Sequence, residues 1–198
     1  KDANGELKYS GTNASEIIQD CITALNGLGG SIFIKKGVYY LTTEITIYPA
    51  NNGLSLYGEG EETKFSLEDD IYGIHLNGTD WSADPVKWVT IKDLKIVGYG
   101  ESHTKIGIWL AGSYNCLVDG LYFENCYDCI YSGGGEDNWF SHNVVTSFYH
   151  TGIHIAGQEN SVHDNTIYYG KAEVTNYTTA ILVDSRRNQI LCNRIEHI

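Results

Sequence analysis

The sequence has 198 residues, a formal net charge of −12, and 22 glycines, 2 prolines and 15 tyrosines. This length suits one domain with an adequate core, and the composition suits a β-rich protein with tight turns. The acidic balance disfavours nucleic acid and anionic membranes as partners, and no run of about 18 apolar residues is present to span a membrane. The chain lacks methionine, so we expect a processed or trimmed product from which any signal peptide has been removed.

Residues 12–27 are predicted to form a helix at the N-terminal end. Thr12, Asn13 and Ser15 supply helix-start signals, and glycines at positions 27, 29 and 30 end the stretch. Apolar residues recur with a helical period at positions 17, 18, 21, 22 and 25. We expect this helix to cap the first coil, whose open sheet end would otherwise expose strand edges.

A pattern with two asparagines five residues apart occurs three times in the C-terminal third of the chain. The pairs are Asn138 and Asn143, Asn160 and Asn165, and Asn188 and Asn193. The intervals between successive pairs are 22 and 28 residues, the longer one containing an insertion near residues 171–179. Such a period with strand-like residues predicts a solenoid in which like residues stack. Asparagine suits sharp corners, because it tolerates unusual backbone angles and its amide satisfies buried backbone groups.

A second strand recurs across the chain, which gives two short strands in each turn of the solenoid. It is found at residues 72–76, 106–110, 128–131, 151–155 and 179–183. A β-sandwich with evenly spaced strands would also fit these strand lengths, but it would give no reason for like residues at like positions. We therefore predict a parallel β-solenoid with its coils in residues 31–198.

Three N-terminal segments resemble the start of the pectate lyase-like, right-handed parallel β-helix superfamily. They are residues 11–22, 29–39 and 54–63, and the resemblance spans residues 11–65, with the later coils continuing it. It implies an all-β, right-handed parallel β-helix with a short N-terminal capping α-helix. The superfamily includes polysaccharide lyases, glycoside hydrolases, epimerases, viral tailspikes and catalytically silent surface proteins, so the fold alone does not choose a function.

Residues 194–198 end inside a predicted strand with no capping helix or polar terminal repeat. A solenoid is not expected to stop in this way. We expect residues 1–198 to form a single β-helix domain with an uncapped C-terminal end, belonging to a longer chain or an assembly. Either the natural chain continues, or this end associates with another copy or a partner.

The second strand predicts an exposed row of side chains on one sheet. Residues between core positions point outward, and those at the central position of each strand are His75, Trp109, Tyr131, His154 and Leu182. The adjacent outward row is predicted to be Asn77, Ala111, Gly133, Ala156 and Asp184. Rings beside small neighbours favour carbohydrate binding, since sugar faces stack on aromatic surfaces. The alternative is that the rings only stabilise the sheet.

The candidate carbohydrate-binding residues are accordingly His75, Trp109, Tyr131, His154 and Asp184. Loops at residues 78–87, 98–105 and 170–178 are predicted to wall this row into a groove. Glycoside hydrolysis needs paired carboxylates, and Asp184 is the one carboxylate that the strand pattern places in the outward rows. Arg186 and Arg187 could hold an acidic sugar, or they could be solvated turn residues. No catalytic residue is assigned, and polysaccharide lyase or glycoside hydrolase activity is left open.

Metal and cofactor sites are not expected. The Cys126-x-x-Cys129 spacing lacks a second ligand pair for zinc, and buried thiols are the default for the five cysteines. His142 and His163 are out of phase by one residue between consecutive coils, which disfavours a shared metal.

Glycosylation sequons begin at Asn13, Asn77 and Asn176. The hypothesis from sequence is an extracellular or cell- or virion-surface module that recognises a polysaccharide or glycan. The alternative is a structural subunit that self-associates through its C-terminal coil in a surface layer, filament or viral particle.

Overall fold

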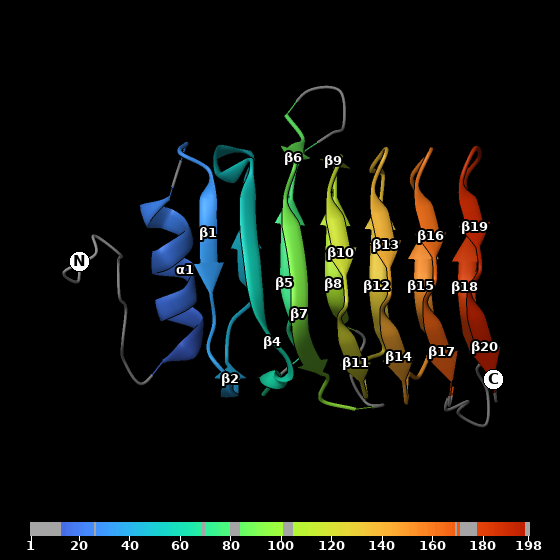
Figure 1. The fold of residues 1–198 in the computed structure, drawn as a ribbon, viewed down its shortest axis with the longest axis horizontal. Helices are drawn as coiled ribbons and strands as arrows, with labels where there is room; N and C mark the ends of the chain where they lie inside the picture. Colours follow the sequence, from blue (N-terminus) through green and yellow to red (C-terminus); the bar gives the residue numbers. More distant parts are fainter. Residues whose placement is uncertain are drawn as a thin grey trace.

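The computed structural model describes residues 13–25, 27–68, 70–79, 84–100, 105–168, 170 and 178–196. In this part of the chain one α-helix precedes a stack of coils whose strands pair in parallel with the strands of neighbouring coils (Figure 1). The predicted all-β parallel β-helix is therefore confirmed. No helix in the described part of the chain is long and apolar enough to cross a membrane.

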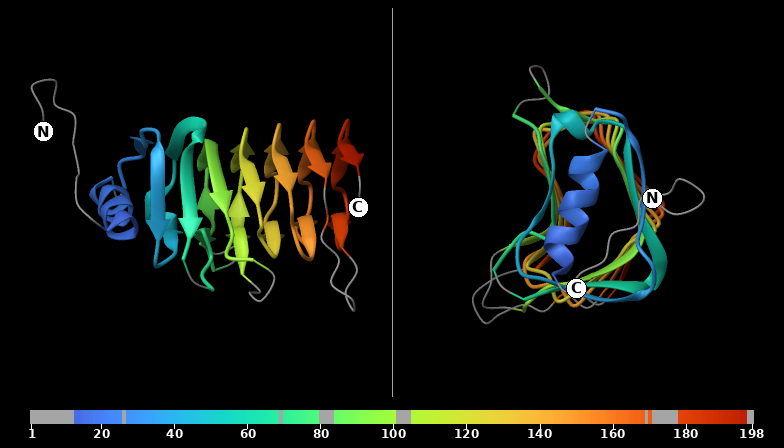
Figure 2. Two further views of the ribbon diagram at one scale, coloured as in Figure 1. Left: turned by 90° about the horizontal axis from the view of Figure 1, so that it is seen from below. Right: turned by 90° about the vertical axis from the view of Figure 1, so that its left-hand side faces the viewer.

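The helix α1 covers the N-terminal end of the coils, as Figure 2 shows in the view along their axis. It spans Ala14–Ala24, and Asn13 caps it because its side-chain oxygen accepts a hydrogen bond from the Glu16 N–H at 3.4 Å. Ile18 and Ile22 are buried against the first coil. Gln19 bonds both the N–H and the carbonyl of Thr46, at 2.9 and 3.0 Å. The helix thus supplies hydrogen bonds to a strand at the end of its sheet.

The first coils contain longer and less regular strands than the later ones. These elements are β1 (Gly30–Phe33), β2 (Gly37–Leu41), β3 (Ile45–Ile47), the 3₁₀ turn η1 (Pro49–Asn51), β4 (Leu54–Leu67), β5 (Ile74–Asn77), β6 (Val86–Lys87) and β7 (Thr90–Val97). The later elements are β8 (Ile106–Ala111), β9 (Ser113–Tyr114), β10 (Leu117–Asp119), β11 (Tyr122–Glu124), β12 (Asp128–Gly133), β13 (Trp139–Ser141) and β14 (Val144–Thr146). The last two coils add β15 (Thr151–Ile155), β16 (Ser161–His163), β17 (Thr166–Tyr168), β18 (Thr179–Val183), β19 (Gln189–Leu191) and β20 (Arg194–Glu196).

Two sheets form most of the solenoid wall. The larger sheet contains β19, β16, β13, β10, β7, β11, β14, β17 and β20 in that order, joined through β4 to β1 and β2. The other sheet has the order β18-β15-β12-β8-β5-β3 and carries the predicted second strand of every coil. A short pair, β6 and β9, lies between them along the chain.

The asparagine ladder is present, and it is buried except at Asn188 and Asn193 in the last described coil. Asn143 Nδ2 donates to Asn165 Oδ1 at 3.0 Å, and Asn165 Nδ2 donates to Asn193 Oδ1 at 2.9 Å. Asn138 Nδ2 donates to Asn160 Oδ1 at 3.0 Å in the parallel ladder. Each amide also bonds the backbone of the preceding coil. The repeat predicted from sequence therefore sets the register between coils.

The corners between strands differ from the prediction, because the residue before each asparagine, and not the asparagine itself, adopts the unusual backbone angle. Asp137, His142, Glu159 and Asp164 have φ values of 52° to 57°, whereas their following asparagines do not have positive φ. This corner also divides the first repeat segment into two strands, such as β13 and β14, so the later coils have three strands each instead of the predicted two. The asparagine is thereby freed to point its amide into the coil interior.

The interior is filled by stacked aliphatic and aromatic side chains. Phe65, Phe123, Phe140 and Phe148 are fully buried, together with a column of isoleucine, leucine and valine residues. Free thiols of Cys116, Cys126 and Cys129 are part of this core. Burial raises the pKa of Cys116 to about 11 and that of Cys129 well above its ordinary value. These thiols therefore act as small apolar side chains.

Candidate functional site

The strand register brings the five predicted row residues together on the six-stranded sheet. His75 pairs with Trp109, Trp109 with Tyr131, Tyr131 with His154, and His154 with Leu182. Because the strands are parallel and in register, these side chains stand at one level along consecutive coils. We call Trp109, Tyr131 and His154 the ring row, since each of the three is partly exposed on the outer face of the sheet.

The prediction that His75 is exposed is wrong. Its ring is buried because Trp109 stacks on it with ring centroids 4.2 Å apart and planes at 4°, while the ring of Tyr72 lies 5.6 Å away. Glu44 from the preceding coil approaches its Nδ1 at 3.5 Å. Burial lowers the pKa of His75 despite the opposing effect of the Glu44 carboxylate. The His75 ring therefore packs against the indole of Trp109 and is covered from solvent.

Contacts along the ring row continue to a carboxylate. The rings of Trp109 and Tyr131 are 6.5 Å apart, and those of Tyr131 and His154 are 4.7 Å apart. His154 Nε2 lies 2.6 Å from an oxygen of Asp184, which follows β18 and is exposed. A stacking surface and a hydrogen-bonding carboxylate thus lie side by side, which is the arrangement that carbohydrate binding by these residues needs.

The glycine of the adjacent row makes room for the rings. A Cβ at Gly133 would lie 3.0 Å from the ring of Tyr131 and 3.3 Å from Trp109 Nε1. The indole N–H is buried and has no hydrogen-bond partner among the described residues. Gly133 therefore allows the two rings to lie close to the sheet.

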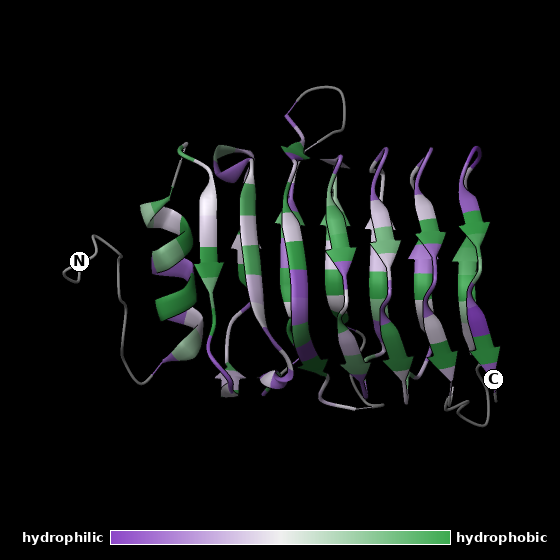
Figure 3. Ribbon diagram, in the orientation of Figure 1, coloured by the Kyte–Doolittle hydropathy of each residue, from purple (hydrophilic) through white to green (hydrophobic). Residues whose placement is uncertain are grey.

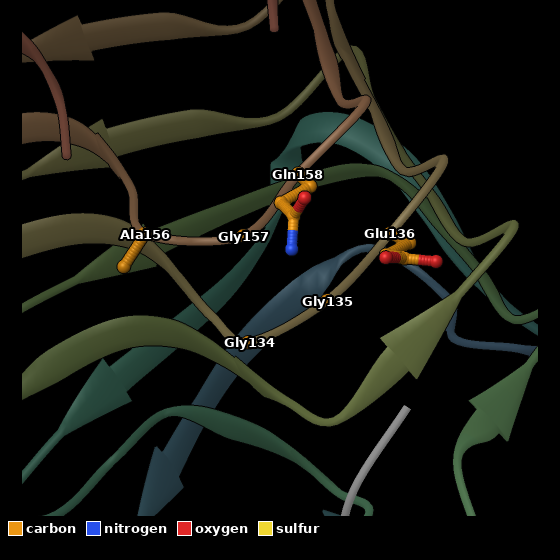
Figure 4. Close-up of a pocket in the computed structure, with 6 residues that line it drawn as sticks. All are labelled: Gly134, Gly135, Glu136, Ala156, Gly157 and Gln158. Atoms are coloured by element: carbon orange, nitrogen blue, oxygen red, sulfur yellow. The ribbon is translucent and has the colours of Figure 1, made fainter. Parts of the chain in front are cut away.

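A small pocket continues from the outward row with small side chains. It has a volume of about 60 Å³ and a floor of glycine and alanine residues, with Glu136 and Gln158 beside it (Figure 4). The side-chain oxygen of Gln158 accepts hydrogen bonds from Arg186 at 3.2 Å and Arg187 at 3.1 Å. This assigns the Gln158 NH₂ group as the donor that faces the pocket, opposite the acceptor oxygens of Glu136. The two arginines thus orient an amide, a role that the sequence did not predict.

The sequence did not predict a histidine–carboxylate pair at the N-terminal ends of β12 and β15 in the same sheet. His150 Nδ1 lies 2.8 Å from Asp128 Oδ1, which accepts a second hydrogen bond from the backbone N–H of Thr151 at 2.9 Å. Asp128 opens β12 and Thr151 opens the neighbouring β15. Alignment of the second strands places Asp128 and Thr151 at equivalent positions. The repeat therefore indicated that Asp128 lies beside the residue that follows His150.

Several other sequence predictions lie away from the ring row or outside the described residues. The rings of His142 and His163 are 6.0 Å apart on the other sheet, each bonded to an aspartate. Among the described residues no group of three potential ligands suited to a metal occurs. Asn13 serves as the helix cap and Asn77 ends β5 with partial exposure. Asn176 and parts of the three loops predicted as groove walls lie outside the described residues.

Comparison with known proteins identifies the family. Residues 72–198 match the family described as right handed beta helix region, so the chain belongs to this family. No curated protein sequence matches the chain.

Solved structures share the fold at low sequence identity. The tailspike protein of E. coli bacteriophage HK620, solved with a pentasaccharide, aligns with a TM-score of 0.76 and 15% identity, over 98% of this chain and 38% of that one. Geobacillus virus E2 ORF18 aligns with a TM-score of 0.70 and 17% identity, over 96% and 40%. The A-module of Azotobacter vinelandii mannuronan C-5 epimerase AlgE6 aligns with a TM-score of 0.69 and 13% identity, over 98% and 55%. The chain therefore spans about two fifths to about half the length of these structures.

Proposed function

We propose that this protein is an extracellular or cell- or virion-surface module that binds carbohydrate on the ring row. The observation that carries the proposal is the contiguous, partly exposed stack of Trp109, Tyr131 and His154 beside small side chains. Tailspike and epimerase structures with the same fold support a carbohydrate ligand, since one was solved with a pentasaccharide and another is named for action on mannuronan.

The contacts suggest how such a ligand would be held. The C–H face of a pyranose ring would pack on Tyr131 and the exposed part of Trp109, where apolar and aromatic surfaces combine. Hydroxyl groups would bond the His154–Asp184 pair and, at the adjacent pocket, the acceptor Glu136 and the donor Gln158. Asp184 is the carboxylate that contacts the ring row in the described structure, so this proposal concerns binding and not cleavage of glycosidic bonds.

Replacement of Trp109 with alanine is expected to weaken glycan affinity by about 2 kcal/mol, the contribution of one well-buried aromatic contact. A glycan array with neutral and polyuronate polysaccharides would identify the ligand, and calorimetric titration would give the affinities of both proteins. Trp139→Ala is the matched control, because Trp139 is an exposed tryptophan on the other sheet. Tyr131→Ala tests the same row without uncovering His75. Unchanged affinity in both row variants would contradict the proposal.

A second candidate function is assembly through the last described coil. Ile190 and Ile195 are 40% and 49% exposed, although they pair with Val162 and Ile167, which are fully buried in the preceding coil. Figure 3 shows these hydrophobic segments on β19 and β20. A face with the composition of a core suits burial by a further coil or by a second copy.

We expect Ile195→Lys to shift self-association of the chain towards monomer, because a charge on this face would be desolvated at the contact. Sedimentation velocity over a range of protein concentrations would measure the effect. Phe33→Lys is a matched control, since Phe33 is 48% exposed on β1 at the opposite end of the larger sheet. A wild-type chain that stays monomeric at the highest concentration would contradict assembly through this face. Ile198, which belongs to the same C-terminal segment of the sequence, lies outside the described residues.

A further inference from the structure

Five histidines in the described structure lie next to carboxylates, and one of these pairs differs from the rest. In the His142, His154 and His163 pairs the carboxylate side chain is 31% to 54% exposed. In the His75 pair the histidine is the buried member. In the Asp128–His150 pair the acid is only 12% exposed whereas the imidazole is 40% exposed. A shielded acid behind an accessible imidazole is the arrangement of a supported base.

The contacts of Asp128 determine which nitrogen of His150 carries a proton. A carboxylate has only acceptor oxygens, so the 2.8 Å contact requires the proton on His150 Nδ1. Neutral His150 therefore has its lone pair on Nε2, and Nε2 has no hydrogen-bond partner in the described part of the chain. The backbone N–H of Thr151 holds the carboxylate from a second direction.

The ring is also fixed in orientation. Tyr127 stacks on His150 with ring centroids 4.9 Å apart and planes at 13°, and the Thr151 hydroxyl lies 3.1 Å from Nδ1. These contacts limit rotation of the imidazole about its own bonds. Nε2 is therefore held in one direction, as a proton acceptor in a reaction must be.

The pair lies at the N-terminal ends of β12 and β15, two inner strands of the sheet that carries the ring row. His150 is the residue before β15, and His154 of the ring row is four residues further along the chain, which corresponds to roughly 13 Å. A group attached to a glycan on the ring row could therefore reach His150.

We propose that His150 is a general base, positioned by Asp128, that activates water to hydrolyse an ester carried by the bound glycan. This inference rests on the proposed function for its substrate. Nε2 accepts a proton as the water oxygen bonds to the acyl carbon, and the ester C–O bond then breaks. The leaving alkoxide takes the proton from Nε2, which gives a free hydroxyl on the glycan and a carboxylic acid, and restores the neutral base.

An ester is the bond that this site fits best. Its acyl carbon is already electrophilic, so a single base that activates water can start its hydrolysis. Glycosidic bonds need a second carboxylate, and in the described structure Asp128 is the carboxylate bonded to His150. A neutral acyl group also avoids repulsion by a chain with a net charge of −12.

The test uses p-nitrophenyl acetate as the probe, with nitrophenolate release followed by absorbance. We expect the wild-type chain to hydrolyse it and His150→Gln to lower the rate about 100-fold, within the usual range for one acid–base group. His163→Gln and His142→Gln are controls, because these two histidines also pair with aspartates, but on the other sheet and with acids that are 49% and 31% exposed. Thermal melts of all variants check folding. Equal rates in the wild type and His150→Gln, or equal losses in the controls, would overturn the proposal.

Asp128→Asn tests the positioning role separately. The amide oxygen can still accept from Nδ1 and from Thr151, but the negative charge is lost. We expect a slower reaction and a larger share of the Nε2–H tautomer of His150, measured by ¹⁵N NMR of the histidine rings. A normal rate with an unchanged tautomer would show that Asp128 has no such role and would also overturn the proposal.

The probe contains no sugar, so failure of this test leaves glycan binding standing. A chain that cleaves the probe through His150 but binds no polysaccharide would overturn the proposed function alone. Acetate release from an O-acetylated form of the glycan that binds, followed by ¹H NMR, then tests the ester on its carrier. Absence of release from that glycan would overturn the assigned substrate.

Discussion

We expect replacement of Asn143 with alanine to lower the free energy of unfolding by about 4 kcal/mol, because two buried backbone groups lose a partner at 1–3 kcal/mol each. Asn143 Oδ1 accepts from the N–H of Leu121 at 3.0 Å, and its Nδ2 donates to the carbonyl of Val118 at 3.0 Å. The same NH₂ group bonds Asn165 in the next coil. Alanine can make none of these bonds, and water does not reach the site, since Asn143 is fully buried.

Asn193→Ala is the control for this prediction. Asn193 makes equivalent bonds, accepting from Asn165 and donating to Val162 at 2.8 Å, but it is partly exposed on the last described coil. Water can replace its amide there, so we expect a loss of about 1 kcal/mol. Urea denaturation followed by circular dichroism and by tryptophan fluorescence would measure both values and test for a single transition. Similar losses in the two variants would show that burial of the ladder contributes little.

The sequence predicted the fold because the coil is repeated. Asn138, Asn160 and Asn188 occupy one stack, and their spacing in the chain is the spacing that the strand register shows. The corner geometry was harder to assign, since the positive φ belongs to residues as different as Asp137 and His142. Backbone conformation at these corners is imposed by coil stacking, which overrides the local preference of the residue.

The strand register of the candidate site was predicted correctly, but the burial of His75 was not. Alternation along the strand correctly placed His75 and Trp109 at one level of the sheet. It could not show that the indole would lie flat on the imidazole, because side-chain rotamers are set by neighbours on other coils. The pairing of Asp128 with His150 was not predicted for a related reason. They are distant in sequence and make a pair only when consecutive coils are stacked.

Replacement of Gly157 with alanine is expected to lower the free energy of unfolding by at least about 3 kcal/mol, the upper part of the range for overpacking. An added Cβ would overlap the carbonyl oxygen of Gly135 and lie 2.8 Å from its backbone nitrogen. Backbone cannot rotate away as a flexible side chain would. The two coils would have to separate where the N–H of Gln158 bonds the carbonyl of Gly135 at 3.0 Å, so the pocket floor would be disrupted as well.

Gly134→Ala is the control for Gly157→Ala, because it adds a methyl group to the same pocket without a clash between coils. Gly134 lines the same pocket, and a Cβ there would meet no atom within 4 Å, although its φ of 79° is unfavourable for alanine. That conformation costs about 1–2 kcal/mol. We therefore expect urea denaturation to show Gly157→Ala as the less stable variant. The reverse order would mean that backbone conformation, and not the close approach of consecutive coils, determines why glycine occupies these positions.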